Sequence, residues 1–317
     1  MAKPPQNVYR GRLAPSPTGF LHLGHARTFW VAWQRSRVAQ GKLVFRNEDL
    51  DYQRCKPEFV RAMYEDLGWL GLDWDEGLDL DSGVSHGSFG PYSQSERHTF
   101  YVDAWRKLRD RGFIYPCTCS RKDLDRAISA PHEPLHGAAL SGSEVTGDAQ
   151  PATDDELPYP GTCRKKLGTA KDYDSPASVS WRFRVPDGET VSFEDGYFGR
   201  QEFVAGRDFA DFLLWRRDDI PAYQLAVVAD DAAMQITEVV RGADLLKSAA
   251  RQLLLIRALE YPVPAYFHCP LLRDEKNIRL AKRHDALSLR KLREQGIDPE
   301  ALRKQFAEEM KSARVKK

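Results

Sequence analysis

Two histidines beside a glycine are the residues of this 317-residue chain best placed for phosphate chemistry. His22 and His25 follow a Pro/Gly loop that leaves a strand-like run at 8–13, and a helical pattern then extends to Gly41. A loop between a strand and a helix N-terminus presents free N–H groups and the positive end of the helix dipole to an anion. Gly24 would let the backbone approach a bound group closely. The stretch predicts a phosphate site, although a surface turn that carries two histidines is the alternative.

Carboxylates gather where the next predicted strand ends. Residues 42–46 are typical of a short buried strand, and Glu48, Asp49 and Asp51 follow directly. In open α/β sheets, ligands bind outside the carboxyl ends of the strands. A solvated acidic turn is the alternative interpretation. The order strand, loop, helix, strand favours the start of a mononucleotide-binding fold.

Three of the five cysteines flank a segment of different composition. Cys117, Cys119 and Cys163 lie on either side of 129–157, a tract rich in Pro, Gly, Ala and Ser that we expect to be flexible. An odd number of cysteines without a signal segment argues against a disulfide framework. Three thiolates suit tetrahedral zinc, which needs a fourth ligand, although three ordinary buried cysteines would show the same spacing. The candidates for the fourth ligand are Tyr159, His132 and His136.

The composition is that of a globular protein. Hydrophobic residues make up 42% of the chain, charged residues 29%, and the net charge is only +1. The overall charge therefore argues neither for nor against nucleic acid as a partner. No apolar run approaches the roughly 20 residues of a membrane span, and the N-terminus lacks the apolar core of a signal peptide. We expect no membrane partner and a cytoplasmic location.

The strand and helix patterns predict an α/β fold with an interruption. We expect a doubly wound parallel sheet of Rossmann type, split by an inserted zinc-containing α+β module. The sheet would resume with strands at 211–216, 220–229 and 236–241, before a helix at 245–259. The predicted units are 1–114 for the first half of the catalytic domain, 115–205 for the insertion, 206–264 for the second half and 265–317 for a C-terminal helical region.

Three local signals complete this outline. Ser95 is expected to cap a helix that ends near Gly112. Residues 179–185 alternate between apolar and polar types, which predicts a half-buried strand, and the Asp-Gly pair at 187–188 is expected to turn the chain towards a partner strand. A basic stretch near the C-terminus contains Lys282, which could reach a phosphate.

In this order, the segments resemble class I aminoacyl-tRNA synthetases of the glutamyl type. Residues 12–25 are similar to that family's R-x-A-P-S-P-T-G loop and HIGH signature, and 47–51 to its R-x-E-D-x-D stretch. Residues 279–283 stand where its KMSKS loop belongs, with Arg279 in place of the first lysine and Ala281 in place of the serine. Further counterparts lie at 94–97, 223–231 and 237–244. The resemblance covers nearly the whole chain.

The resemblance implies that ATP and Mg²⁺ activate L-glutamate as glutamyl-adenylate, with catalytic roles for His22, His25 and Lys282. The residues implied to bind ATP are His22, Gly24, His25, Arg279, Leu280 and Lys282. The residues implied to bind glutamate are Arg12, Leu13, Ala14, Pro15, Ser16, Glu48, Tyr223 and Arg241. Among these, Arg12 is expected to hold the side-chain carboxylate, Arg241 the α-carboxylate and Glu48 the ammonium group.

One short branch of the family fits best, the glutamyl-queuosine branch, which loads glutamate onto queuosine in the anticodon loop of tRNA(Asp). The residues after Lys282 are too few for an anticodon-binding domain, so we expect a small stem-contact-like helical region instead. The branch carries one structural zinc on Cys-x-Cys and Tyr-x-x-x-Cys. That pattern favours Tyr159 over the two histidines, although the spacer after Cys119 is stretched. Activation is expected without tRNA, by a monomer.

Three other functions stay open at this point. The chain could be a truncated glutamyl-tRNA synthetase that charges a tRNA 3′ end, a catalytically inert RNA-binding paralogue, or a nucleotidyltransferase of the wider HIGH superfamily. The presence of both histidines and Lys282 argues against the inert paralogue. The joint presence of Glu48, Tyr223 and Arg241 argues against the nucleotidyltransferase.

Overall fold

The computed structural model describes residues 8–79, 84–120, 123, 159–272 and 288–315. Its strands are β1 (Arg10–Leu13), β2 (Lys42–Phe45), β3 (Gly77–Leu78), β4 (Ser85–His86), β5 (Ile114–Cys117), β6 (Ser180–Phe183), β7 (Thr190–Asp195), β8 (Gly199–Val204), β9 (Phe212–Trp215), β10 (Glu238–Gly242) and β11 (Ala265–Cys269). Its α-helices are α1 (Leu23–Val38), α2 (Pro57–Trp69), α3 (His98–Asp110), α5 (Tyr223–Ala233), α6 (Leu246–Leu259), α7 (Leu289–Glu294) and α8 (Pro299–Val315), and its 3₁₀ turns are η1 (Gln94–Glu96), η2 (Arg164–Asp172) and η3 (Ala243–Leu245). Within these ranges, every helix is too short or too polar to span a membrane.

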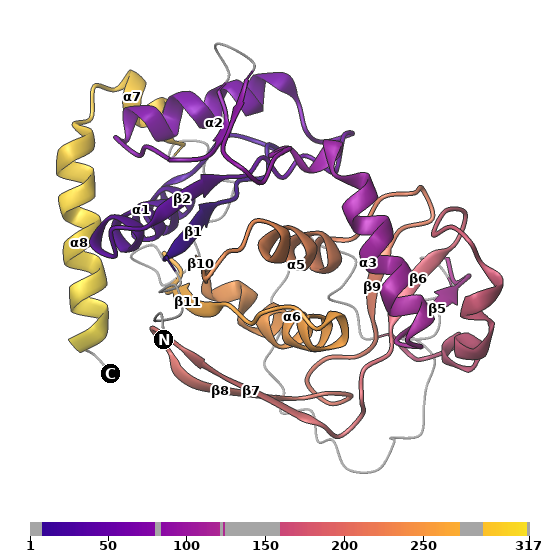
Figure 1. Cartoon of the computed structure of the whole chain (residues 1–317). Helices are drawn as coiled ribbons and strands as arrows, with labels where there is room; N and C mark the ends of the chain where they lie inside the picture. Colours follow the sequence, from indigo (N-terminus) through magenta and orange to yellow (C-terminus); the bar gives the residue numbers. More distant parts are fainter. Residues whose placement is uncertain (1–7, 80–83, 121–122, 124–158, 273–287, 316–317) are drawn as a thin grey trace, which may run out of the picture.

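Parallel strands form the centre of the molecule (Figure 1). β1 pairs in parallel with β2, and β10 pairs in parallel with β11. The two pairs meet where the backbone N–H of Thr237 donates to the carbonyl of Arg10 over 2.9 Å. β11 also pairs in parallel with β7, through Tyr266 and Asp195, and β7 pairs antiparallel with β8. The sheet that we predicted as parallel is therefore mixed, because an antiparallel hairpin extends it.

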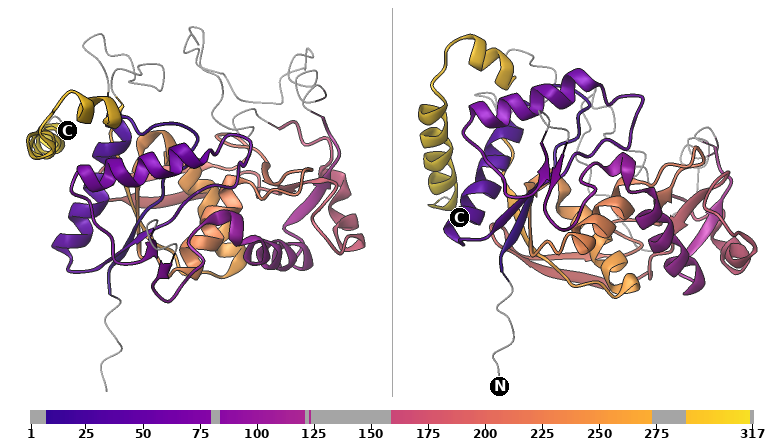
Figure 2. Two further views of the ribbon diagram at one scale, coloured as in Figure 1. Left: turned by 90° about the horizontal axis from the view of Figure 1, so that it is seen from above. Right: turned by 45° about the horizontal axis from the view of Figure 1, so that its top comes forward.

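A second sheet, with the order β5–β6–β9 and antiparallel pairing, lies at the far end of the molecule from the C-terminal helices (Figure 2). We predicted that the turn at 187–188 leads from β6 to a partner strand. It leads instead into β7, which belongs to the central sheet. Conversely, β9 pairs with β6 and not with the central strands. The sheets thus cross the predicted boundary at 205–206. The division into four units stays a prediction, and its flexible tract at 129–157 lies outside the described residues.

Two further local predictions were wrong. Residues 220–229 do not form a strand, because α5 begins at Tyr223. A short run of apolar residues that is buried on all sides gives no periodicity to separate helix from strand. Ser95 does not cap a helix, since its hydroxyl donates to Asp49 over 2.8 Å and α3 begins only at His98. The predicted helices at 25–41 and 245–259 and the strand at 42–46 are present as α1, α6 and β2.

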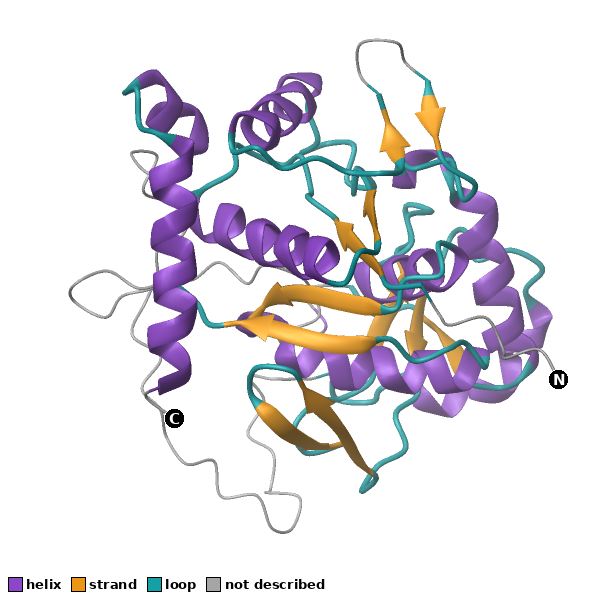
Figure 3. Cartoon of the chain, turned by 60° about the vertical axis from the view of Figure 1, so that its left-hand side comes forward, coloured by secondary structure: helices purple, strands orange, loops and turns teal. Residues whose placement is uncertain are grey.

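Two apolar clusters hold these elements together. One joins α3, α5 and α6 to the second sheet and includes the fully buried rings of Trp105, Trp181 and Trp215. The other joins α1, α2, β1 and β2 to the C-terminal helices. In it, the ring of Phe306 in α8 packs on Trp30 in α1, with centroids 6.1 Å apart. The C-terminal helix therefore stands against the N-terminal half of the fold, at one side of the molecule (Figure 3).

Candidate active site and cysteine cluster

The loop after β1 places both candidate histidines at the start of α1. His22 is the N-cap residue, and its Nδ1 atom accepts a hydrogen bond from the Gly24 N–H over 3.1 Å. The rings of His22 and His25 stack with centroids 3.7 Å apart. A Cβ atom on Gly24 would lie only 3.1 Å from the His22 ring, so glycine allows this close approach. Both imidazoles lie where the helix dipole favours an anion.

Ser288, the first described residue after 273–287, lies beside His22. His22 forms an isolated antiparallel bridge with Ser288, and the Leu289 N–H donates to the Leu21 carbonyl over 2.8 Å. These contacts join the segment that begins at Ser288 to the histidine loop. The candidate residues Arg279, Leu280 and Lys282 lie outside the described residues.

A buried ionic network includes Glu48, one of the residues predicted to bind glutamate. The fully buried Arg46 donates to Asp231 over 2.6 Å and to Glu48 over 2.9 Å, and its Nε atom lies 3.8 Å from Asp230. Arg97 donates to the same Asp230 over 2.6 Å. Burial raises the pKa of Glu48, although the charge of Arg46 opposes this shift. Sequence reasoning missed Arg46 and both aspartates, because their pairing joins segments that are far apart in the chain.

Arg12 stands at the edge of this network. Its side chain is buried, and Nη1 donates to the Val240 carbonyl over 2.8 Å. Its Nε atom is 3.5 Å from the nearest oxygen of Asp231, which is long for an ion pair. The Arg12 charge is therefore only loosely compensated within the protein.

The neighbouring loop residues approach Glu48 mainly through their backbone. The Glu48 N–H donates to the Pro15 carbonyl over 3.0 Å, and the Ser16 hydroxyl lies 3.5 Å from a Glu48 oxygen. The side chain of Leu13 is fully buried in the apolar core, so it could meet a ligand only through its backbone. Ala14 is half-buried beside it.

Arg241 has an unusual set of partners for a buried guanidinium. Its Nε donates to Nε2 of His268 over 3.0 Å, and its Nη1 donates to the Gln252 side-chain oxygen over 2.8 Å. The third nitrogen, Nη2, is buried and has no hydrogen-bond partner among the described residues. Across the described ranges, Arg241 makes no ion pair with a carboxylate. A buried cation with only neutral partners suits an anionic ligand, because an uncompensated buried charge is costly.

The residues predicted to bind glutamate lie close enough for their charges to act on one another. Burial raises the pKa of the Tyr223 hydroxyl, the charges of Arg241 and Arg12 act to lower it, and the charge of Glu48 acts to raise it. Tyr223 begins α5, and Arg241 lies in β10. Arg12 lies in β1, and Glu48 lies in the loop that follows β2. The fold thus brings together four candidates from four separate segments.

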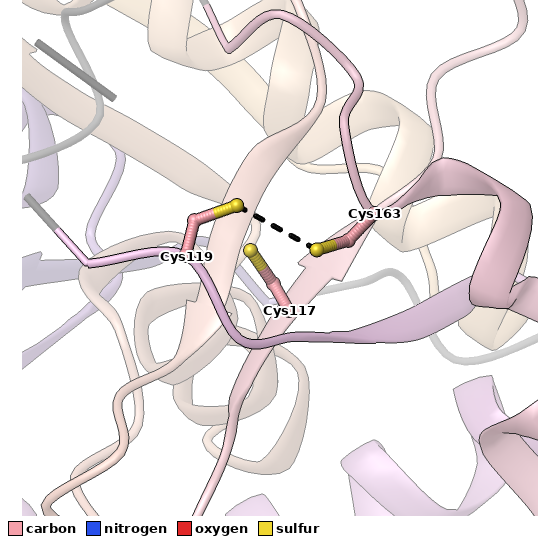
Figure 4. Close-up of side chains that lie close together, drawn as sticks. All are labelled: Cys117, Cys119 and Cys163. Atoms are coloured by element: carbon pink, nitrogen blue, oxygen red, sulfur yellow. Dashed lines mark hydrogen bonds between the residues drawn. The ribbon is translucent and has the colours of Figure 1, made fainter. Parts of the chain in front are cut away.

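The three candidate cysteines also meet, at the end of β5 (Figure 4). Their sulfur atoms all lie within 4.8 Å of one another, and the Cys119 and Cys163 sulfurs are 3.6 Å apart. The buried Tyr159 hydroxyl lies 3.5 Å from the Cys117 sulfur and 3.7 Å from the Cys119 sulfur. Ligands on tetrahedral zinc stand about 3.8 Å apart for two sulfurs and about 3.5 Å for sulfur and oxygen, from the usual bond lengths. The donor set therefore fits zinc.

The acidities of the thiols differ within the cluster. Burial raises the pKa of Cys119 to about 11. Burial acts in the same direction on Cys163, but hydrogen bonds from the Thr118 backbone and from Tyr159 outweigh it and lower its pKa to about 6. Cys163 thus forms a thiolate more easily than Cys119. The other two candidates for the fourth ligand, His132 and His136, lie outside the described residues.

Residues 9–310 match the family described as tRNA synthetases class I (E and Q), catalytic domain. The chain is 45% identical over 295 residues to a protein of Symbiobacterium thermophilum named glutamyl-Q tRNA(Asp) synthetase, across 92% of this chain and 83% of that one. It is 39% identical over 304 residues to glutamate–tRNA ligase 2 of Acidithiobacillus ferrooxidans, across 94% of this chain and 57% of that one.

Solved structures show the same likeness. The glutamate-tRNA synthetase of Elizabethkingia anophelis superposes with a TM-score of 0.67 at 28% identity, across 87% of this chain and 53% of that one. A glutamate tRNA ligase of Elizabethkingia meningosepticum, solved in complex with its amino acid, gives a TM-score of 0.65 at 28% identity. The chain spans about half the length of these solved proteins, 52% and 53%.

Proposed function

The chain belongs to the class I tRNA synthetase family of the glutamyl and glutaminyl type, and we propose that it activates L-glutamate with ATP and transfers it to queuosine in the anticodon of tRNA(Asp). Aminoacyl-tRNA synthetase chemistry is common to this family. The choice of queuosine as acceptor is supported by relatives named for that activity, which match this chain over most of their own length.

The buried Arg241 carries the proposal for glutamate. Free glutamate has two carboxylates and one ammonium group. The partly paired guanidiniums of Arg12 and Arg241 suit the two carboxylates, since charge-assisted hydrogen bonds from arginine are strong and directional. We assign Arg12 to the side-chain carboxylate and Arg241 to the α-carboxylate. Glu48 accepts from the ammonium group, and the Tyr223 hydroxyl supplies a further hydrogen bond.

The first step joins glutamate to AMP. An oxygen of the α-carboxylate attacks the α-phosphorus of ATP, and the bond from that phosphorus to the pyrophosphate oxygen breaks. The attacking carboxylate is already ionised at neutral pH, so the step needs positioning and charge stabilisation but no general base. His22 and His25 donate to the phosphates at the start of α1. By resemblance, Lys282 neutralises the departing pyrophosphate, and Mg²⁺ supplies further charge stabilisation when bound.

The second step transfers the glutamyl group to RNA. A hydroxyl of the queuosine cyclopentenediol attacks the carbonyl carbon of glutamyl-adenylate, its proton is released, and AMP leaves with the bonding electrons. We propose that the first step proceeds without tRNA.

Exchange of labelled pyrophosphate into ATP tests the first step. Purified protein without tRNA is assayed with glutamate, glutamine or aspartate as the amino acid. We expect exchange with glutamate alone, because glutamine lacks one of the two carboxylates that the arginines hold, and aspartate is one methylene too short to bring a carboxylate to each arginine. Exchange that requires tRNA, or that is faster with glutamine, would contradict the proposal.

We propose that Cys117, Cys119, Tyr159 and Cys163 hold one structural zinc ion. The ion would tie the end of β5 to the start of η2, where Arg182 also stacks on the Tyr159 ring, 3.8 Å from its centroid. Metal analysis of the purified protein should give one equivalent of zinc, and Cys163→Ser should reduce it to a small fraction. Tyr159→Phe should weaken zinc retention against a chelator. Unchanged retention in Tyr159→Phe would rule out the tyrosine as fourth ligand.

Charging of a tRNA 3′ end is the second candidate function. The relatives named glutamate–tRNA ligase and the solved glutamyl-tRNA synthetases favour it. The two functions share glutamyl-adenylate and differ only in the acceptor. Assays with tRNA(Glu) and with queuosine-bearing tRNA(Asp) separate them.

A further inference from the structure

Two buried side chains, Asp195 and His268, form a hydrogen-bonded chain that leads to Arg241. The Asp195 carboxylate lies 2.6 Å from Nδ1 of His268, and Nε2 of His268 lies 3.0 Å from Nε of Arg241. The side chains of Asp195 and His268 are fully inaccessible to solvent. Neither Asp195 nor His268 takes part in the adenylation chemistry described above.

The donors in this chain assign the tautomer of the histidine. The Arg241 Nε–H can only donate, so Nε2 of His268 must accept and carry no proton. The proton is then on Nδ1, which donates to Asp195. Burial lowers the pKa of His268, which favours this neutral form, although the hydrogen bond to Asp195 acts in the other direction. A neutral His268 accepts from Arg241 without cancelling its positive charge.

A turn in the backbone holds Asp195 in place. One of its carboxylate oxygens accepts from the N–H groups of Tyr197 and Phe198, over 3.0 Å and 2.8 Å. The other accepts from the His268 N–H over 3.1 Å. Asp195 ends β7 at the turn of the β7–β8 hairpin, so this hairpin supplies the anchor of the hydrogen-bonded chain.

Glutamines hold the guanidinium from a second direction. Gln252 accepts from Nη1 of Arg241 over 2.8 Å and donates to Gln224 over 3.0 Å, and Gln224 donates to Ser248 over 3.2 Å. All these side chains are buried. Two of the three guanidinium nitrogens are therefore fixed by neutral acceptors on α6 and β11. Nη2 has no hydrogen-bond partner among the described residues, so its N–H groups can meet a ligand.

We propose that His268, locked by Asp195, is a positioning residue that orients the Arg241 guanidinium for the glutamate α-carboxylate. This inference rests on the proposed function, because it assigns to Arg241 the role argued above. His268 touches neither glutamate nor ATP and acts through Arg241 alone.

Two substitutions separate the contacts that the two ring nitrogens of His268 make. The amide nitrogen of asparagine can replace Nδ1, so His268→Asn keeps the contact with Asp195 and loses the acceptor for Arg241. The amide oxygen of glutamine can replace Nε2, so His268→Gln keeps an acceptor for Arg241. We expect His268→Asn to raise the KM for glutamate roughly tenfold to hundredfold in pyrophosphate exchange, with the KM for ATP within about twofold of wild type. His268→Gln should restore most of the affinity for glutamate.

A merely structural role predicts a different result. Loss of packing would raise both KM values together or lower the thermal stability of both variants alike, and either outcome would overturn the inference. Arg241→Met is measured in parallel. Undiminished glutamate exchange in Arg241→Met would refute the proposed glutamate site itself. Loss of exchange in Arg241→Met together with a normal KM for glutamate in His268→Asn would refute only the role of His268.

Discussion

Arg46 and Arg241 are both buried arginines beside the same site, but their partners differ in charge. Arg46 meets three carboxylates, Glu48, Asp230 and Asp231, and its charge is fully compensated inside the protein. Arg241 meets an imidazole and an amide, and one of its nitrogens has no partner in the part of the chain that the structure describes. The same residue type thus serves structure in one place and is arranged for ligand binding in the other.

The difference shows how the fold separates stability from recognition. A guanidinium that is neutralised by fixed carboxylates holds strands and helices together and has little attraction left for an anion. A guanidinium fixed by neutral acceptors keeps both its orientation and its charge. Arg12 is intermediate, because its contact with Asp231 is long. We therefore expect substitution at Arg46 to affect mainly folding, and substitution at Arg241 to affect mainly glutamate.

The largest effect on stability is expected for Arg46→Met. The substitution would leave Glu48, Asp230 and Asp231 without their shared cation in the protein interior. Removal of one partner from a buried charge network costs about 3–5 kcal/mol of unfolding free energy. Urea denaturation measures the loss. A loss smaller than that of Arg241→Met would contradict the structural role of Arg46.

The same substitution at Arg241 should give the reverse pattern. Arg241→Met should lower kcat/KM for glutamate in pyrophosphate exchange by about a hundredfold to a thousandfold, because a buried charged contact with the substrate is lost. Its unfolding free energy should fall by less than half as much as that of Arg46→Met, since only neutral acceptors lose a partner. A variant that unfolds as readily as Arg46→Met and keeps its glutamate kinetics would reverse the comparison.

Asp66 extends the comparison to a buried carboxylate with a poor partner. Its side chain is fully buried in α2, and within the described ranges both of its oxygens lack hydrogen bonds. Arg293 of α7 approaches only to 3.7 Å. Burial raises the pKa of Asp66 to about 6, while Arg293 acts to lower it. An aspartate in the unfolded chain has a pKa of about 3.9. Between these values the native state retains a proton that the unfolded state has lost.

Native stability should therefore decline as pH rises through the window from about 4 to about 6, by up to roughly 3 kcal/mol from this group. Asp66→Asn removes the titration. The unfolding free energy of the variant minus that of wild type should therefore rise from about pH 4 to about pH 7, as measured by urea denaturation at both values. The same pH dependence in both proteins would show that Asp66 stays ionised in the native state.

The sequence predicted the elements with a strong local signal. The Pro/Gly loop, the helix at α1 and the strand at β2 follow from periodicity and from helix punctuation, and the cysteine spacing indicated the cluster. Sequence spacing alone did not choose Tyr159. That choice came from resemblance, and the tyrosine hydroxyl does lie beside two of the sulfurs.

Long-range pairing accounts for what the sequence could not predict. The contact between Arg46 and Asp231 joins two halves of the fold, so neither local pattern shows that its charge will be buried. Residues 220–229, which contain the first part of α5, were predicted as a strand. Their apolar run shows no helical periodicity, because the helix is buried on all sides. Asp195 has no local sequence signal for its role, because the pairing of β7 with β11 brings it to His268.

The proposed transfer of glutamate to queuosine is tested most directly by finding where on the acceptor RNA the glutamate is attached. Labelled glutamate and ATP are incubated with the protein and with tRNA(Asp) that carries or lacks queuosine. The RNA is then cleaved into an anticodon fragment and a 3′-terminal fragment. We expect label in the anticodon fragment of the queuosine-bearing tRNA only. Label on the 3′-terminal fragment, or equal labelling of tRNA without queuosine, would contradict it.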